Sequence, residues 1–270
     1  MRLRTSVLGL TLAALAATAL QPSPAAAQRR GDQPRLVFTV MPGFVFGNDL
    51  WQVPNQPVLN RFNELDTFAI RRDIGSTLGV VFSGAYYPGD HVGFVGEAQL
   101  VGVGFDDGCR LVHSTGDPKN ISLCNTLDTQ SEAATAVALS GGVILRTASR
   151  RVVSPYGRLQ LGLTLSNQSS KRVISSDNSG AEPVLVTIYP DEHNTRLLPS
   201  AAIGLGFTAA LGPGYQLRWE ARDNMIAMNT ITGPTARDGQ SPPTKMTVKH
   251  LPAIFIGLDV VLERRRGRRY

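Results

Sequence analysis

The stretch Tyr215-Gln-Leu-Arg-Trp-Glu-Ala-Arg222 decides the fold. Its side chains alternate with a period of two, which is typical of an extended strand whose successive residues face opposite sides of a sheet. One face is apolar and the other is polar and charged. A strand between lipid and a polar barrel lumen routinely shows such a contrast between its faces, although one amphipathic edge strand of a soluble sheet gives a similar pattern. The apolar face carries Tyr215, Leu217, Trp219 and Ala221, and the polar face carries Gln216, Arg218, Glu220 and Arg222.

Seven further stretches are predicted strands; six repeat this alternation of faces, and the fourth strand of the chain, 133–147, is rich in small residues and alternates less clearly. Between the first and second, third and fourth, fifth and sixth, and seventh and eighth strands the connections are long. The other three connections are short. Strict alternation of long and short connections over an even number of strands is typical of an outer-membrane barrel. The other predicted strands are 36–46, 77–86, 92–100, 133–147, 157–166, 201–211 and 246–262.

The sequence therefore predicts an all-β fold. We expect an eight-stranded antiparallel up-and-down transmembrane β-barrel with short periplasmic turns and four long external loops. The long connections are residues 48–70, 106–132, 167–196 and 223–245, the first with possible strand extensions of its own. Within the third, two β-rich runs around residues 172–175 and 184–189 flank a turn, which predicts a hairpin extending the fifth and sixth strands.

Residues 1–27 have the pattern of a signal peptide. Arg2 and Arg4 precede an apolar run at 7–20, and alanines at 25–27 form a small-residue cleavage site. The apolar run is shorter than the roughly 20 residues that a spanning helix needs. We therefore expect export through the Sec route with cleavage. Only helices and closed barrels satisfy all their backbone hydrogen bonds in lipid. Since the sequence offers no spanning helix, any membrane insertion must be as a closed barrel.

The predicted organisation has four parts. Residues 1–27 are the signal peptide, 28–34 a polar lead-in, 35–262 the barrel and 263–270 a basic tail.

The net charge of +6 is concentrated at the two ends of the chain. Removing the two arginines of the signal peptide leaves +4, and removing the five arginines of the tail leaves −1. The body is nearly neutral, whereas a nucleic-acid-binding domain needs a basic face. We therefore expect no nucleic-acid partner. The tail arginines are Arg264, Arg265, Arg266, Arg268 and Arg269.

The architecture resembles the small eight-stranded outer-membrane barrels of the OmpA and OmpX type over residues 35–262, without a specific shared motif. The resemblance implies the outer membrane of a Gram-negative-type bacterium, outer-membrane lipid and the barrel-assembly machinery as partners, and a monomer. Such barrels usually end on an alternating strand with a terminal aromatic residue. Tyr270 is aromatic but follows an arginine run, so the chain departs from that pattern at its end.

Cys109 and Cys124 are the only cysteines, and both lie in the second long connection. In an exported chain this pair predicts one disulfide. Their spacing does not suit a zinc site, which takes four ligands in close pairs. No metal or cofactor is expected.

The polar residues predicted to face the lumen form a second candidate site. Buried charges must pair, because an unpaired buried charge is costly, and an eight-stranded barrel is just wide enough to be filled by side chains. We expect a packed ionic plug in which Glu97 pairs with Arg222 and Glu220 is held by Arg218 or Arg222. A gated path for small solutes is the alternative. The predicted lumen residues are Glu97, Gln99, Arg158, Gln160, Gln216, Arg218, Glu220 and Arg222.

Four tyrosines fall at the short-turn ends of their strands, where an aromatic girdle is expected at the membrane interface. They are Tyr86, Tyr87, Tyr156 and Tyr215.

The histidines give no catalytic pattern. His91, His113, His193 and His250 do not stand in a recognisable arrangement with serine. We therefore expect a non-enzymatic protein with a structural or surface-interaction role through its external loops. A narrow gated channel for ions or small solutes is the first alternative, and an enzyme that cleaves lipids or peptides is the second.

Overall fold

The computed structural model describes the barrel and its long connections. The predicted signal peptide, the lead-in and residues 264–270 of the predicted tail lie outside the described residues, as does His193. The described ranges are 35–132, 135–147, 152–167, 169–180, 182–191, 197–212 and 214–263.

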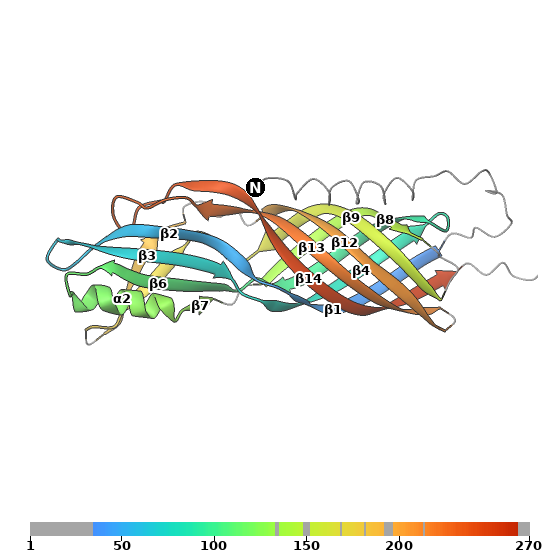
Figure 1. The fold of residues 1–270 in the computed structure, drawn as a ribbon, viewed down its shortest axis with the longest axis horizontal. Coiled ribbons are helices and arrows are strands. Elements are labelled where there is room, and N and C mark those ends of the chain that lie inside the picture. The colour runs from blue at the N-terminus through green and yellow to red at the C-terminus, as the bar shows by residue number, and fades with distance from the viewer. Residues whose placement is uncertain are drawn as a thin grey trace, which may run out of the picture. The chain divides into compact units, whose positions relative to one another are not determined.

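Eight strands close into an antiparallel barrel in the order β1-β14-β13-β12-β9-β8-β5-β4 (Figure 1). Each strand pairs with the next barrel strand along the chain, and β1 pairs with β14 to close the sheet. The predicted fold class is confirmed. The barrel strands are β1 (Arg35–Val45), β4 (Thr77–Tyr87), β5 (Val92–Gly102), β8 (Thr135–Arg146), β9 (Val153–Ser166), β12 (Leu197–Gly212), β13 (Tyr215–Ile231) and β14 (Thr244–Glu263).

The outward face of the barrel is apolar. On β9, Leu159 and Leu161 are 51% and 68% exposed, whereas Arg158 and Gln160 between and beside them are 4% and 0% exposed. Leucines and phenylalanines repeat this pattern on the other strands. A continuous apolar exterior around a polar interior is the reverse of a soluble barrel and matches a lipid-facing belt.

Strands β13 and β14 are longer than the sequence predicted. The expected loop at 223–245 is wrong in part, because β13 continues to Ile231 and β14 begins at Thr244. The period of two continues past Asp223, with Asn224, Ile226 and Met228 all buried. The two strands therefore stay paired as far as Ile231 and Thr244.

The first two long connections form a four-stranded sheet in the order β2-β3-β6-β7, with one helix packed against it. The expectation that 106–132 is only a polar loop is wrong. Asp117 caps the helix, proline follows at its first position, and Asn120, Leu123, Cys124 and Leu127 make a buried face at helical spacing. The elements are β2 (Asn48–Leu59), β3 (Leu65–Ile74), β6 (Phe105–His113), α2 (Pro118–Asp128) and β7 (Ser131–Glu132).

The hairpin predicted in the third long connection is confirmed as β10 (Val173–Asp177) paired with β11 (Val184–Tyr189). It forms a separate two-stranded sheet, so the expectation that it extends the barrel strands is wrong. The helix α2 packs on β10.

One hydrophobic core joins the barrel to its long connections. It includes Met41 and Phe255 from barrel strands and Phe68, Leu123 and Tyr189 from the connections. We call the elements β2, β3, β6, β7, α2, β10 and β11 the head. Within the described part of the chain, no helix has the length and apolarity needed to cross a bilayer.

Candidate functional site

Arg222 occupies the centre of the lumen between two carboxylates. Its Nη1 donates to Glu97 Oε1 at 2.5 Å, and its Nε donates to Glu220 Oε1 at 2.8 Å. Gln99 Oε1 accepts a further bond from Nη1 at 3.2 Å. The ring of Phe255 lies 4.9 Å from the guanidinium carbon. The structure thus brings together Glu97 and Arg222, which the sequence predicted to pair.

Arg158 contacts the same two carboxylates from β9. Its Nη1 lies 2.8 Å from Glu97 Oε2, and its Nη2 lies 2.6 Å from Glu220 Oε1. The N–H groups do not point at those oxygens, so these are ion pairs without aligned hydrogen bonds. Tyr156 donates its hydroxyl to Glu220 Oε2 at 2.6 Å.

A second buried pair lies nearer the short turns. Arg218 donates from Nε and Nη2 to the carboxylate of Asp259, at 2.8 to 3.0 Å, and Thr39 donates its hydroxyl to the same carboxylate at 2.8 Å. Of the two arginines expected to hold Glu220, Arg222 makes the hydrogen bond, and Arg218 pairs with a residue that the sequence analysis missed.

The lumen network carries no net formal charge, because three arginines face three carboxylates and all six are buried. The network lies between two apolar clusters, one including Val37, Tyr87 and Ile144 and the other being the core shared with the head. A packed and neutral set of ion pairs of this kind fills the middle of the lumen.

Two glycines on β12 make room for the network. A Cβ added at Gly204 would lie 2.8 Å from Glu220 Oε1, and one added at Gly206 would lie 2.7 Å from the Tyr156 hydroxyl. At Gly204 the space is taken by the charged Glu220, whereas at Gly206 the Trp219 carbonyl oxygen and the Tyr156 ring both exclude a larger residue.

The remaining predicted lumen residues are also inside. Gln160 is fully buried, and Gln216 is half-buried at the short-turn end of β13.

The prediction of a tyrosine girdle at the membrane interface is wrong for two of its four members. Tyr86 and Tyr215 are exposed, but Tyr87 and Tyr156 are 1% and 6% exposed and face the lumen. Neighbouring strand residues face opposite sides, so Tyr86 and Tyr87 cannot both face lipid.

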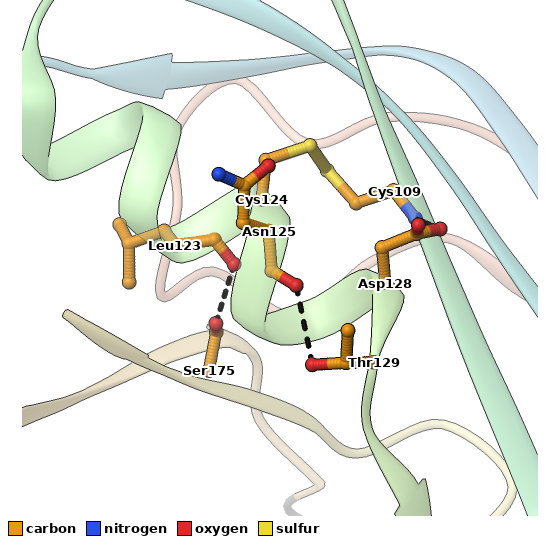
Figure 2. Close-up of a disulfide and its surroundings, with 7 residues drawn as sticks. All are labelled: Cys109, Leu123, Cys124, Asn125, Asp128, Thr129 and Ser175. Atoms are coloured by element: carbon orange, nitrogen blue, oxygen red, sulfur yellow. Dashed lines mark hydrogen bonds between the residues drawn. A yellow bond between two sulfur atoms is a disulfide. The ribbon is translucent and has the colours of Figure 1, made fainter. Parts of the chain in front are cut away.

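Figure 2 shows the predicted disulfide between Cys109 of β6 and Cys124 of α2. Beside it, Ser175 of β10 donates its hydroxyl to the carbonyl of Leu123 at 2.7 Å. The helix is therefore fixed to the head sheet on one side and to the β10–β11 hairpin on the other.

Replacing Cys109 and Cys124 by serine is expected to weaken the head and spare the barrel. Closing a loop with a separation of 15 residues stabilises by about 3 kcal/mol relative to the open chain. Fluorescence of Trp51, with Trp219 replaced by phenylalanine, measures the head. A difference in gel migration between the unboiled and the boiled protein shows whether the barrel is folded. Loss of the folded barrel in the double serine variant would contradict this assignment.

Buried polar contacts join the long connections to one another. Arg72 of β3 forms a bidentate pair with Asp107 of β6 at 2.6 and 2.8 Å, and its Nη1 donates to the carbonyls of Ser169 and Arg172. Arg72 is fully buried. This one side chain therefore connects the first three long connections.

Gln56 of β2 joins the fourth long connection to the first and the third. Its Oε1 accepts hydrogen bonds from the Tyr189 hydroxyl and the Thr235 backbone N–H, both at 2.9 Å, and its Nε2 donates to Thr235 Oγ1 at 2.9 Å. Burial raises the pKa of Tyr189, so its hydroxyl keeps the proton that it donates. All four long connections are thus parts of one packed unit.

The N-cap of α2 predicts a pH dependence. Burial alone would raise the pKa of Asp117, but hydrogen bonds from the backbone and side chain of Arg61 and from the Lys119 N–H hold it below its ordinary value. This stabilisation is present above the unfolded value of about 3.9 and is lost as the pH falls through the lower folded value. We expect head stability measured by Trp51 fluorescence to fall below about pH 4, and Asp117→Asn to flatten that fall. An unchanged pH profile in this variant would show that another group is responsible.

The described histidines form no catalytic arrangement. His250 Nδ1 lies 2.7 Å from Asp223 Oδ2 on the exposed face, and His91 Nδ1 lies 3.1 Å from the Arg146 carbonyl oxygen. His113 is exposed at the end of β6. Among the described residues, no group of three His, Cys, Asp or Glu side chains is placed to hold a metal ion.

No protein-family model and no curated protein matches the chain. Solved structures resemble it at low identity. The outer membrane protein OprG of Pseudomonas aeruginosa has a TM-score of 0.48 and 13% identity, and covers 86% of this chain and 98% of its own. Neisserial surface protein A has a TM-score of 0.42 and 11% identity, covering 85% and 97%. The outer membrane protein AlkL has a TM-score of 0.39 and 10% identity, covering 92% and 98%. The similarity concerns the fold alone.

Proposed function

We propose that this outer-membrane barrel is a non-enzymatic anchor that presents its folded head at the cell surface for interaction with a polysaccharide or another protein. The observation that carries the proposal is the packing of all four long connections into one unit, through Arg72, Gln56 and the Cys109–Cys124 disulfide. A binding surface benefits from such order, because ordering it beforehand lowers the entropic cost of association.

The filling of the lumen by buried ion pairs favours the same assignment over the channel alternative. The ion pairs of Arg158, Arg218 and Arg222 lie between two apolar clusters. The cluster that includes Met41 and Phe255 continues into the head. Export with removal of residues 1–27, insertion by the assembly machinery and a monomeric state belong to the same proposal.

Exposed apolar side chains on the head are the candidate contact residues. Phe62 between β2 and β3 is 70% exposed, and Leu65 at the start of β3 is 52% exposed. On the β10–β11 hairpin, Leu185 is 76% exposed. Such side chains outside the lipid-facing belt are typical of interaction surfaces when they are grouped.

Cells displaying the full chain test the proposal. We expect them to be retained on immobilised bacterial polysaccharide or immobilised matrix protein more than cells without it, and Phe62→Ser with Leu65→Ser to remove the gain. Leu161→Val on the lipid-facing belt is the matched control and should keep the gain. Equal retention with and without the displayed protein on both surfaces would contradict the proposal.

A further inference from the structure

Positive charge is distributed unevenly between the two ends of the barrel. The long-connection side, residues 46–76, 103–134, 167–196 and 223–251, holds fifteen acidic and eleven basic residues. The lumen network is neutral. By contrast, residues 264–269 hold five arginines and no acidic residue. The excess of basic residues therefore follows directly on the end of β14, on the side of the short turns.

This arginine run begins at the edge of the lipid-facing belt. Leu262 on the outer face of β14 is 52% exposed and is paired with Leu36 of β1, which is 38% exposed. Leu36 is paired in turn with Tyr86 of β4, which is 48% exposed. An exposed tyrosine beside the last exposed leucines is typical of the membrane interface. Arg264 follows Leu262 by two positions, so the run starts at the level of the lipid headgroups.

The chain length keeps these arginines near that level. Each residue spans at most about 3.6 Å, so Arg264, Arg265 and Arg266 lie within roughly 11 Å of the Glu263 backbone. The headgroup layer is about 5–8 Å thick on each side of a bilayer. The first three arginines of the run are thus always within reach of the phosphates of the surrounding leaflet.

Two arginines of the barrel strands lie at the same end. Arg35 stands opposite Glu263 in the register of β1 and β14. Arg146 ends β8, where its guanidinium carbon lies 3.9 Å from the centre of the Tyr87 ring and its Nε donates to the carbonyl of Asp90. With Asp90 and Glu263 as the acidic residues, this end of the barrel carries a net formal charge of +5. We call its arginines the rim cluster: Arg35, Arg146, Arg264, Arg265, Arg266, Arg268 and Arg269.

We propose that the rim cluster binds the headgroups of anionic phospholipids in the leaflet that surrounds the short-turn end of the barrel. Four to eight basic residues next to a membrane-spanning segment are typical of anionic-lipid binding. A guanidinium group also matches phosphate oxygens with two parallel hydrogen bonds. The cluster begins where the lipid-facing belt ends, so these phosphates are its nearest anions. This lipid site lies at the opposite end of the barrel from the head and goes beyond the surface role proposed above.

Fluorescence quenching by brominated lipids tests the site in the full chain. Trp219 is the reporter, because it is 40% exposed on the outer face of β13 and is paired with Ile256 of β14, the strand that leads into the arginine run. Trp51 is buried in the core of the head and gives a constant background. The protein is reconstituted in equal mixtures of phosphatidylglycerol and phosphatidylcholine, with the bromine on one lipid or on the other.

We expect the wild type to prefer phosphatidylglycerol by at least about fivefold, the factor that one arginine contributes near an anionic surface. Replacing all five arginines of residues 264–269 by glutamine should bring the preference close to one. The matched control replaces five basic residues of the head side by glutamine and should keep the preference. These control residues are Arg71, Arg110, Lys119, Arg237 and Lys245.

The folded barrel in each variant is checked by the difference in gel migration between unboiled and boiled protein. Equal quenching by the two brominated lipids in the folded wild type would overturn the proposal. An unchanged preference in the variant without the five arginines, or an equal loss in the control, would overturn it as well. Capture of the wild type alone on purified peptidoglycan, without a preference for phosphatidylglycerol, would assign the rim cluster to the cell wall instead.

Discussion

Replacing Arg222 by methionine is expected to destabilise the barrel by about 3–5 kcal/mol, the cost of breaking a buried ion pair. Arg222 donates to both Glu97 and Glu220, so its loss leaves these two carboxylates with Arg158 as their one contacting arginine among the described residues. The network then holds three carboxylates and two arginines. Methionine retains most of the apolar volume against Phe255, so the loss measures charge rather than packing.

Urea unfolding of the full chain in lipid vesicles measures this effect. Gln216→Ala removes a half-buried lumen side chain outside the ion pairs and should change stability by less than about 0.5 kcal/mol. Glu97→Gln combined with Arg222→Met restores neutrality and should recover part of the loss. A double variant as unstable as the sum of the two single variants would show that Glu97 and Arg222 do not interact.

Replacing Arg72 by methionine is expected to unfold the head locally while the barrel persists. Arg72 is fully buried, and its loss leaves the Asp107 carboxylate without its paired cation and two carbonyls without their donor. The expected cost is about 3–5 kcal/mol. Because the lumen network is made by other residues, the barrel should stay folded, and the unboiled variant should still migrate differently on gels from the boiled one.

Arg71 is the matched control for this variant. It neighbours Arg72, but its side chain is 63% exposed and it contacts Asp73 only at 3.8 Å. Such a surface pair is worth about 0–1 kcal/mol, so Arg71→Met should be nearly neutral. Limited proteolysis of intact cells reads out head unfolding. Equal protease sensitivity of the two variants would show that the buried pair does not hold the head together.

The barrel could be predicted because each of its signals is local. Strand 157–166 alternates leucine with polar residues, and the loop lengths repeat without exception. The Glu97–Arg222 contact followed from the inward faces of their strands and from the need of buried charges to pair. Continuing the same alternation along β14 would have placed Asp259 in the lumen and found the partner of Arg218, since only the apolar face of that strand entered the prediction.

The head could not be predicted to the same extent, because its contacts join distant connections. Gln56 and Thr235 are separated by 179 positions, and neither belongs to a periodic pattern that foretells their contact. Helix α2 is different, since Asp117-Pro118 and the buried face from Asn120 to Leu127 give a local signal. The polar composition around the cysteines concealed that signal.

Single-channel recording of the full chain in planar bilayers tests the central claim most directly. A lumen filled by neutral, buried ion pairs and covered by the core shared with the head should give no conductance steps in the wild type. Arg222→Met, which opens the centre of the network, should give brief openings if it still folds. Sustained conductance of the folded wild type would contradict a closed barrel that serves as the anchor of its head.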